Sequence, residues 1–401
     1  MAWISRTATT FSPPVMEARR WLDGVTLAPD MPLINVSQAA PVEPPPEPLR
    51  RVIAEAALET PQAHLYGPVL GRSDLREEVA RQWTEAYGGP IGADNVAITS
   101  GCNQAFCATI ASLCAEGDEV ILPTPWYFNH KMWLDMTGVR AVPLPAGAGL
   151  LPDPERAAAL IGPRTRAIVL VTPNNPGGVE YPAGLVRAFF DLAQRRGLTL
   201  VMDETYRDFD AREGAPHDLF ETPDWGETLI QLYSFSKAYR LTGHRVGAML
   251  AAPAHLAEAE KFLDTVTICP NQLGQIAALW GLRNLGRWLA GERAEILDRR
   301  QAIAEAMPVL ETEGWSLLGC GAYFAYLHHP FAMSSRELAP LLVREAGILL
   351  LPGTMFMPEE DPAGSRQVRV AFANIDRADI GTLFRRLTGV GWPLAPAGDS
   401  A

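Results

Sequence analysis

The sequence predicts an α/β protein with a mostly parallel sheet flanked by helices and a second, smaller α/β domain. The main observation is that short β-rich runs alternate with helical segments from Asn95 onward, which is typical of parallel sheets covered on both faces. The runs are Val96–Thr99, Glu119–Leu122, Arg166–Thr172, Leu198–Asp203 and Thr228–Ser234. A second observation is that polar or aromatic residues directly follow each run. Because ligands of such sheets bind at the carboxyl ends of the strands, these positions predict a ligand site.

The length and composition describe an ordinary globular protein of two domains. The chain has 401 residues, of which 48% are hydrophobic and 20% charged, and a domain commonly holds roughly 100–200 residues. The net charge of −12 disfavours nucleic acid and anionic membrane surfaces as partners. The sequence shows neither an apolar run of about 18 residues nor the long apolar region of a secretory signal. We therefore expect a cytoplasmic protein.

The cysteine and histidine patterns predict no metal site. The five cysteines show no C-x-x-C pair or zinc-like spacing, and the seven histidines form no H-E-x-x-H array. We expect free thiols in a reducing compartment. The cysteines are Cys102, Cys107, Cys114, Cys269 and Cys320.

The chain before the sheet predicts helices joined by loops rich in proline and glycine. In order we expect a helix at Pro14–Leu22, a short strand within Leu33–Pro41, an extended proline cluster at 41–48, and helices at Leu49–Glu59 and Asp74–Tyr87. Tyr66 lies in the loop between the last two helices. A tyrosine in such a loop packs against its neighbours more often than it binds a ligand.

The first strand end predicts a phosphate site. Gly101, Cys102 and Asn103 follow the run and open a helix. Small residues at a helix N-terminus expose backbone N–H groups and the positive end of the helix dipole, which suits a phosphate. The pattern is weak by itself, because many strand-to-helix turns look like this.

The next three strand ends add an aromatic face, an amide and a carboxylate. The aromatic cluster around Tyr127 can stack on a ring or can equally pack in the core. Asn175 lies in a turn bounded by prolines, and Asp203 and Tyr206 follow an apolar run. A carboxylate buried there without a cation would be costly.

The fifth strand end carries Lys237, one of only three lysines in the chain. A partly desolvated lysine can lose its proton, whereas arginine cannot, and the neutral amine attacks an aldehyde. With Ser234, Ser236 and Arg245 close to it in the sequence, Lys237 is a candidate Schiff-base lysine. The alternative is a surface lysine in a polar loop. Together, the five strand ends describe a pocket for a phosphorylated aromatic aldehyde with a basic ring nitrogen, which is pyridoxal 5'-phosphate.

The C-terminal part predicts the smaller domain, because helices dominate and strands are few. The expected elements are a helix at Glu292–Leu310, strands at Gly314–Leu317 and Tyr323–Leu327, a helix at Arg336–Ala346, strands at Ile348–Leu351 and Gln367–Phe372, and a terminal helix. We divide the chain into an N-terminal arm and small-domain segment (1–48), a large cofactor-binding domain (49–290), a small domain (291–390) and a disordered tail (391–401).

Four motifs, in order along the chain, resemble the class I/II aminotransferases, which are fold-type-I pyridoxal-phosphate enzymes. The resemblance runs from about Leu33 to Leu387. The motifs are N-N-P-x-G at Asn174–Gly178, D-E-x-Y at Asp203–Tyr206, S-F-S-K-x-Y-x-x-x-G-x-R-x-G around Lys237, and R-V-A-F-A-N at Arg369–Asn374. The resemblance implies a transaminase that moves an amino group between an α-amino acid and a 2-oxo acid. It also implies a homodimer with shared active sites.

The resemblance assigns roles to individual residues. Lys237, Asp203 and Tyr206 are the implied catalytic residues: Lys237 forms the Schiff base and moves the proton, and Asp203 pairs with the ring nitrogen. Asn175 joins Tyr206 at the phenolic oxygen, and Tyr127 stacks on the ring. The implied phosphate site comprises Gly101, Cys102, Asn103, Ser234, Ser236 and Arg245, with Tyr66 from the neighbouring subunit. The implied substrate-binding residues are Arg369, which holds the α-carboxylate, Asn175 and Ala39.

The chain also departs from the family pattern. Ala39 or Ala40 stands where the family has glycine, Gly177 replaces a usual threonine, and Thr172 replaces an asparagine. Asn103 occupies a position that is lysine in some members specific for aspartate, which weakens the case for a dicarboxylic substrate. The sequence does not identify the amino acid.

Two other classes of protein share parts of this pattern. Another fold-type-I enzyme, such as a C–S β-lyase or a cyclopropane-forming synthase, would use nearly the same cofactor shell. A transcription regulator with an aminotransferase-like domain is disfavoured, because only about thirty residues precede the region of resemblance and the chain is acidic.

Overall fold

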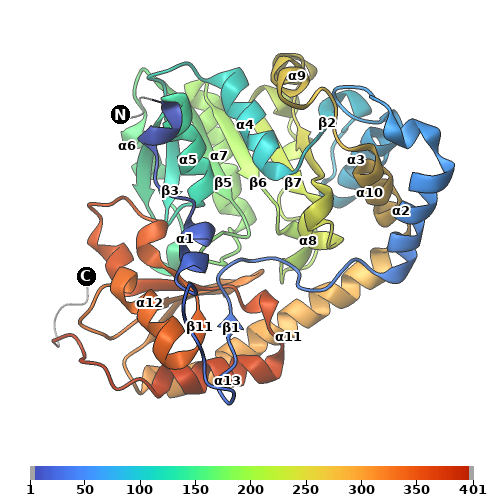
Figure 1. The fold of residues 1–401 in the computed structure, drawn as a ribbon. Helices are drawn as coiled ribbons and strands as arrows, with labels where there is room; N and C mark the ends of the chain where they lie inside the picture. The colour runs from blue at the N-terminus through green and yellow to red at the C-terminus, as the bar shows by residue number, and fades with distance from the viewer. Residues whose placement is uncertain (1–4, 397–401) are drawn as a thin grey trace.

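A seven-stranded sheet forms the centre of the protein in the computed structural model, which describes residues 5–396 (Figure 1). Its strands lie in the order β2-β8-β7-β6-β5-β3-β4. Only β8 runs antiparallel to its neighbours among these strands, so the predicted mostly parallel sheet is confirmed. In chain order the strands are β2 (Val96–Thr99), β3 (Glu119–Thr124), β4 (Arg140–Pro145), β5 (Thr165–Val171), β6 (Thr199–Asp203), β7 (Leu229–Ser234) and β8 (Gly247–Leu250).

Strand β4 is a strand of this sheet that the sequence did not predict. It lies at the edge of the sheet and pairs only with β3, so several of its residues remain partly exposed. It also contains Pro143 and Pro145. Proline cannot donate a hydrogen bond to a neighbouring strand, which is tolerated at an edge and hides the β pattern in the sequence.

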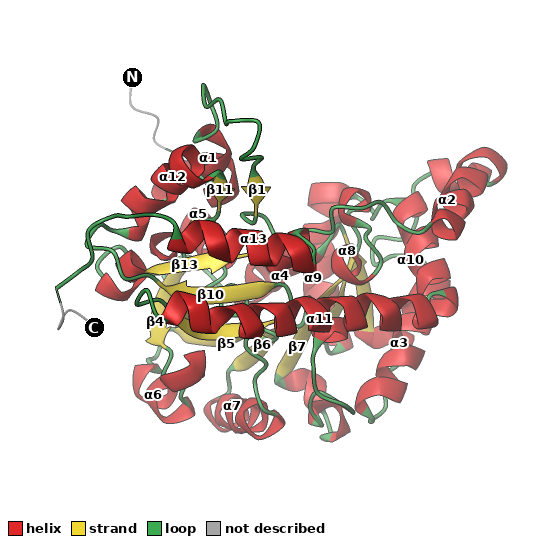
Figure 2. Ribbon diagram, turned by 90° about the horizontal axis from the view of Figure 1, so that it is seen from below, coloured by secondary structure: helices red, strands yellow, loops and turns green. Residues whose placement is uncertain are grey.

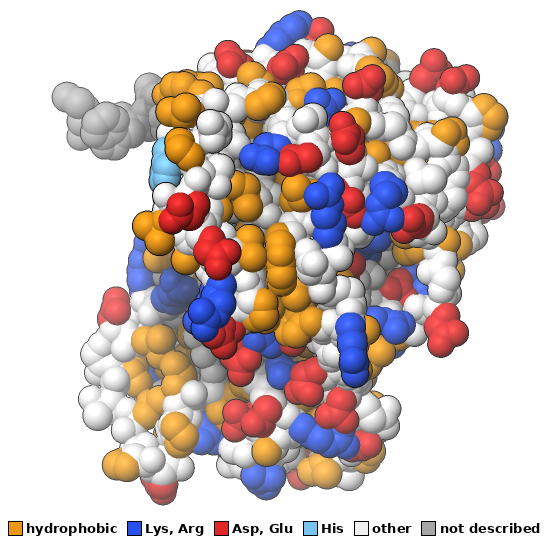
Figure 3. Space-filling view, turned by 90° about the vertical axis from the view of Figure 1, so that its right-hand side faces the viewer, with side chains coloured by type: hydrophobic (Ala, Val, Ile, Leu, Met, Phe, Trp, Pro, Cys, Tyr) orange, Lys and Arg blue, Asp and Glu red, His pale blue; other side chains and the backbone are white. Residues whose placement is uncertain are grey.

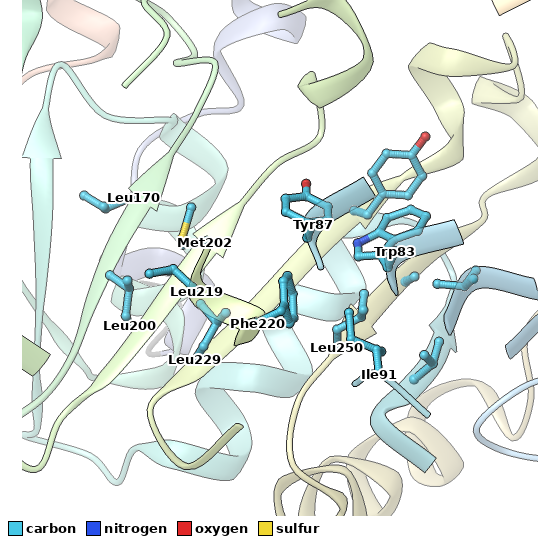
Figure 4. Close-up of a cluster of buried hydrophobic side chains, with 14 of the residues drawn as sticks. Trp83, Tyr87, Ile91, Leu170, Leu200, Met202, Leu219, Phe220, Leu229 and Leu250 are labelled. Atoms are coloured by element: carbon cyan, nitrogen blue, oxygen red, sulfur yellow. The ribbon is translucent and has the colours of Figure 1, made fainter. Parts of the chain in front are cut away.

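Helices cover both faces of the sheet (Figure 2). Successive side chains of each strand therefore enter different cores. In β3, Val120 and Leu122 join one core while Ile121 joins the other. The first face is covered by α4 (Cys102–Leu113), α5 (Phe128–Thr137) and α9 (Pro253–Thr267). The second face is covered by α3 (Ser73–Tyr87), α6 (Pro154–Leu160), α7 (Ala183–Arg196) and α10 (Gln272–Asn284). Figure 4 shows this second core, in which Trp83 and Tyr87 of α3 lie beside side chains of the sheet.

A smaller domain is built around a four-stranded antiparallel sheet in the order β12-β13-β10-β9. Its strands are β9 (Ser316–Gly321), β10 (Phe324–His328), β12 (Leu351–Pro352) and β13 (Gln367–Val370). Its helices are α11 (Gly286–Glu311), α12 (Ser335–Ala346) and α13 (Arg377–Thr388). Helix α12 begins with a reciprocal cap, in which Ser334 and Glu337 each accept a backbone N–H of the other residue.

The N-terminal segment belongs to the small domain by its pairing. Strand β1 (Ile34–Asn35) lies parallel to β11 (Ile348–Leu349), and α1 (Pro14–Arg20) precedes it. The proline cluster then runs as a loop to α2 (Glu47–Glu59), which packs on α10 (Figure 1). The predicted domain boundary near residue 290 falls inside α11, which begins at Gly286.

The start of the predicted disordered tail is held by backbone contacts. Leu394 forms a β-bridge with Phe331, and the Ala395 N–H donates to the carbonyl of Pro330 at 2.9 Å. Residues 391–396 therefore depart from the expected disorder, while 397–401 lie outside the described residues.

The face of the molecule seen in Figure 3 carries charges of both signs between apolar groups. Among the helices of residues 5–396, none is long and apolar enough to cross a membrane. All five cysteines are free thiols, as the sequence predicted.

Candidate active site

A cavity of about 290 Å³ opens at the carboxyl edge of the central sheet. Twelve of the predicted site residues line it: Ala39, Cys102, Asn103, Tyr127, Asn175, Asp203, Tyr206, Ser234, Ser236, Lys237, Arg245 and Arg369. Gly101 lies directly beside Arg245, whereas Tyr66 does not line the cavity. A larger cavity of about 630 Å³ lies between residues 9–17, α5 and residues 352–360. It contains none of the predicted residues, so the smaller cavity is the candidate site.

Lys237 is positioned by the short helix α8 (Phe235–Ala238), which directly follows β7. The Ser234 hydroxyl caps this helix by accepting the N–H of Ser236 at 3.3 Å. The Lys237 Nζ donates to the carbonyl oxygen of Ala39 at 2.6 Å. Burial, followed by the nearby cations of Arg245 and Arg369, lowers the pKa of Lys237 to about 8. A substantial fraction of the amine is therefore neutral near physiological pH and can act as a nucleophile or a base.

Asp203 ends β6 and is a buried carboxylate with two donors. Its Oδ1 accepts the N–H of Thr205 at 3.0 Å, and its Oδ2 lies 3.3 Å from Nε2 of His130. Burial alone would raise the pKa of Asp203, but the His130 and Thr205 contacts outweigh it and hold the pKa below its usual value. The carboxylate is therefore ionised and can pair with a cationic ring nitrogen.

His130 is a site residue that the sequence reasoning missed. It lies on α5, and its ring is stacked on Phe106 with centroids 3.9 Å apart while Tyr127 meets it edge-on at 5.0 Å. The signal that could have found it was its spacing of one helical turn from Tyr127.

A narrow cradle lies between the N-terminus of α4 and Arg245. Gly101 caps this helix with φ +86°, and a Cβ built on it would lie 2.3 Å from Nη2 of Arg245. The Arg245 Nη1 donates to the Thr242 carbonyl at 3.0 Å and to the Ser236 hydroxyl at 3.4 Å. A guanidinium, hydroxyls and the free N–H groups of a helix start suit a phosphate. This part of the cavity thus fits the phosphate of the predicted cofactor.

Arg369 of β13 lies at the other end of the cavity and is 2% exposed. Its guanidinium is packed between the rings of Phe324 and Phe356, at 5.0 and 4.9 Å. Nη1 donates to Oδ1 of Asn175 at 3.0 Å and Nη2 to the carbonyl of Ser37, while Nε has no partner in the described chain. Burial lowers the pKa of Arg369 to about 10, so the group stays cationic at neutral pH. A buried cation with an unused donor fits a carboxylate ligand.

The two tyrosines and the thiol of the cavity remain protonated at neutral pH. Burial raises the pKa of Tyr127 to about 12 and raises those of Tyr206 and Cys102 well above their usual values. The Tyr127 hydroxyl accepts from Asn129 at 2.9 Å and lies 3.4 Å from Oδ1 of Asn103. These hydroxyls can therefore donate hydrogen bonds rather than act as bases.

The predicted site residue Tyr66 and the motif residue Glu204 lie away from the cavity. Tyr66 is 80% exposed in the loop after the 3-10 helix Pro61–His64, so its predicted role at a neighbouring subunit stays a prediction. Glu204, the neighbour of Asp203, is buried in the second core instead. It accepts from Tyr87 at 2.9 Å and lies 3.3 Å from Nε2 of His217, which makes it part of the core's polar network.

Comparison with known proteins decides the family. The sequence profile described as aminotransferase class I and II matches residues 32–387. The chain belongs to this family. As an aminotransferase, it moves an amino group between an α-amino acid and a 2-oxo acid. The fold and function predicted from the motifs are thereby confirmed, and no comparison favours the C–S β-lyase alternative.

The similar proteins include several named aminotransferases. An aromatic aminotransferase of Arabidopsis thaliana is 26% identical over 355 residues, which cover 86% of each chain. A probable aspartate/prephenate aminotransferase of Thermus aquaticus is 29% identical, over 77% of this aminotransferase and 79% of the relative. The fold matches that of the aspartate aminotransferase from Thermus thermophilus solved with maleate. Its TM-score is 0.86 at 24% identity, over 97% of this chain and 99% of the other.

Proposed function

We propose that this aminotransferase uses pyridoxal 5'-phosphate and holds it with the residues of the 290 Å³ cavity. The observation that carries the proposal is that one cavity combines a lysine with a lowered pKa, a buried carboxylate and a phosphate cradle. When bound, the cofactor supplies an aldehyde that reacts with amines and a ring that accepts the electrons of a broken Cα–H bond.

Different residues of the cavity would hold the phosphate, the ring nitrogen and the phenolic oxygen of this cofactor. Arg245, Ser234, Ser236 and the helix start at 101–103 would hold the phosphate, and Asp203 would keep the ring nitrogen protonated. Tyr206 and Asn175 would donate to the phenolic oxygen, and Tyr127 would cover the ring. The phosphate and nitrogen contacts lie at opposite ends of the ring, so together they fix its direction.

Lys237 and Arg369 would act on the substrate. Arg369 can hold the α-carboxylate through two N–H groups, a fork that lysine cannot form. The neutral Nζ of Lys237 can then take the proton from the substrate α-carbon. In the second half of the transamination, it can return a proton to the α-carbon of the new amino acid. The Ala39 carbonyl, which now accepts from Nζ at 2.6 Å, lies beside the same position.

A transamination assay with isolated protein tests this proposal. We expect cofactor-loaded enzyme to convert an amino acid and a 2-oxo acid into the exchanged pair, measured by chromatography. We expect Lys237→Ala to abolish this conversion and the covalent cofactor adduct that borohydride fixes in the wild type, detected by mass spectrometry. Release of pyruvate with ammonia or a thiol, without the exchanged amino acid, would instead indicate a β-lyase. If borohydride fixed the cofactor on Lys131 or Lys261 instead, that lysine and not Lys237 would be the Schiff-base residue.

We also propose a homodimer in which Tyr66 reaches the phosphate site of the partner. The loop of Tyr66 is joined to the turn after α9 by a hydrogen bond of 3.3 Å from the Gly67 N–H to Sγ of Cys269. The segments on either side of this junction carry exposed apolar side chains: Leu58, Leu65, Tyr66, Val266 and Ile268. Exposed apolar groups gathered in this way are typical of an interface.

Mixing two variants tests the shared site directly. Lys237→Ala and Tyr66→Ala subunits should each be impaired as homodimers. After they are unfolded and refolded together, a mixed dimer would hold one site with an intact Lys237 and an intact Tyr66. We expect activity to reappear in the mixture, and light scattering to show a dimer. An active monomer, or a mixture no better than its parts, would argue against sharing. The cytoplasmic location stays a prediction from the sequence.

A further inference from the structure

The larger cavity, of about 630 Å³, is separate from the candidate active site. The two cavities share α1 as a wall, because Val15 lines the smaller one whereas Pro14 and Glu17 line the larger one. The larger cavity is also bordered by α5 and by the start of α12. These helices lie on the opposite side of the molecule from α2, and so away from the subunit contact proposed above (Figure 1). The volume is that of a pocket for a small organic molecule.

Part of the lining of this cavity is apolar. Trp126 and Met357 line it and are 6% and 9% exposed, and the buried Pro14 and Pro352 line it as well. Phe11 adds a ring that is 39% exposed. Because covering apolar surface is favourable in water, these side chains suit a ligand with an apolar ring.

The charged groups of the lining favour a cation. Four carboxylates and two basic groups line the cavity, so negative charge is in excess. Asp135 is already paired with Lys131. Between residues 5 and 396, no basic side chain lies within 4.0 Å of the other three carboxylates, which belong to Glu17, Glu359 and Glu360. A cationic ligand would therefore gain favourable charge interactions in this cavity.

Two buried polar atoms of residues that line the cavity lack a partner. Nε1 of Trp126 and Oγ1 of Thr354 have no hydrogen-bond partner in the described part of the chain. Buried polar groups are nearly always paired. These two donors therefore indicate an oxygen acceptor that the chain itself does not supply.

We propose that the 630 Å³ cavity is a second ligand site, which binds a small organic cation with an apolar ring and an oxygen acceptor. The ring packs on Trp126 and Met357, and the ammonium lies near the unpaired carboxylates. The oxygen accepts from the hydroxyl of Thr354. This ligand binds without reacting, because the cavity holds none of the residues proposed to carry the cofactor.

Binding of lidocaine to the cofactor-loaded enzyme tests this site. Lidocaine combines a tertiary ammonium, an amide carbonyl and an aromatic ring, and a tertiary amine cannot form a Schiff base with the cofactor. We expect calorimetry to give a dissociation constant of about 1 mM or lower. The same anilide without the amine, 2,6-dimethylacetanilide, should bind about fivefold more weakly, because it lacks the charge.

Charge variants locate the ligand. Glu17→Gln combined with Glu359→Gln should weaken lidocaine about fivefold and leave the anilide within about twofold. The matched control is Glu311→Gln combined with Glu313→Gln. It removes the same charge from exposed residues that do not line the cavity, and it should leave both ligands within about twofold.

Thr354→Val separates ligand binding from a structural role. The change replaces an unpartnered hydroxyl by a methyl group of similar size, so Tm of the ligand-free protein should not fall. The same variant should bind both lidocaine and the anilide about threefold more weakly, because each loses one hydrogen bond.

Four results would overturn the proposal. They are no binding of lidocaine at about ten times the expected dissociation constant, an anilide that binds as tightly as lidocaine, equal losses in the two double variants, and unchanged affinity in Thr354→Val. Displacement of lidocaine by a saturating 2-oxo acid would place the ligand in the smaller cavity and would overturn the proposal as well.

Discussion

Replacement of Gly101 by alanine tests whether the cradle at Arg245 holds the cofactor phosphate. Gly101 has φ +86° and ψ 166°, a region that is essentially restricted to glycine and costs other residues about 1–3 kcal/mol. The added Cβ would also lie 2.3 Å from Nη2 and 3.0 Å from Cζ of Arg245. Backbone strain therefore lowers stability, and the clash moves the guanidinium away from the helix start.

The effect on cofactor binding follows from the contact that is lost. A hydrogen bond to a charged group contributes about 1.5–3 kcal/mol, so displacement of Arg245 should raise the cofactor dissociation constant about 10- to 100-fold. The assay is titration of pyridoxal 5'-phosphate into apo-enzyme, followed by absorbance, together with thermal unfolding of the apo-protein.

Gly117→Ala is a control for backbone strain alone. Gly117 has the same φ of +86°, but a Cβ there would meet no atom within 4 Å. We expect this variant to lose stability while it binds the cofactor as tightly as the wild type. If Gly101→Ala also binds the cofactor as the wild type does, and only its stability falls, then Arg245 and the start of α4 do not form the phosphate site.

Three further predictions concern charge in the cavity. Asp203→Asn should slow exchange of the substrate α-proton by several orders of magnitude and Asp203→Glu by less, because the buried carboxylate supplies charge; equal single-turnover rates for asparagine and aspartate would place the ring nitrogen elsewhere. His130→Leu removes the imidazole whose Nε2 lies 3.3 Å from Oδ2 of Asp203, so the pKa of Asp203 should rise. The acidic limb of the plot of kcat/KM against pH should then move to higher pH, and a limb that stays in place would contradict this prediction. The neutral amine is the form of Lys237 that reacts, so covalent incorporation of cofactor into apo-enzyme should speed up as pH rises through about 8; a stopped-flow midpoint near the ordinary value of 10.5 would show that Lys237 is not desolvated.

The strand ends could be predicted because each combines two independent signals. An apolar run marks a strand buried on both faces, and the polar residue after it marks the edge where the sheet meets its ligand. Asp203 and Lys237 were found in this way and share one cavity. The exposed edge strand β4 lacks both signals, since its burial is incomplete and prolines interrupt it.

Contacts between distant segments could not be predicted from the sequence. The partner of Asp203 is His130, and the partner of Gln38 is Arg19 on the preceding helix. The spacing from Tyr127 could have marked His130 as a site residue, but neither pairing is written in the sequence, because each depends on how two elements pack. The start of α11 at Gly286, earlier than the expected Glu292, has a local cause: Gly286 and Gly291 are poor helix formers and weaken the pattern.

The reversed direction of β8 has a consequence for how the chain tolerates change. Ser234 at the end of β7 pairs with Gly247 at the start of β8, so the connection Phe235–Val246 begins and ends at the cofactor edge. It can carry both Lys237 and Arg245 without crossing a face of the sheet, which a parallel connection would require over about a dozen residues or more. Turns at the opposite edge, such as the one around Gly197, could accept inserted residues with little effect on catalysis. An insertion between Phe235 and Val246 would change the spacing between the reacting amine and the phosphate anchor, and should inactivate the enzyme even if the protein still folds.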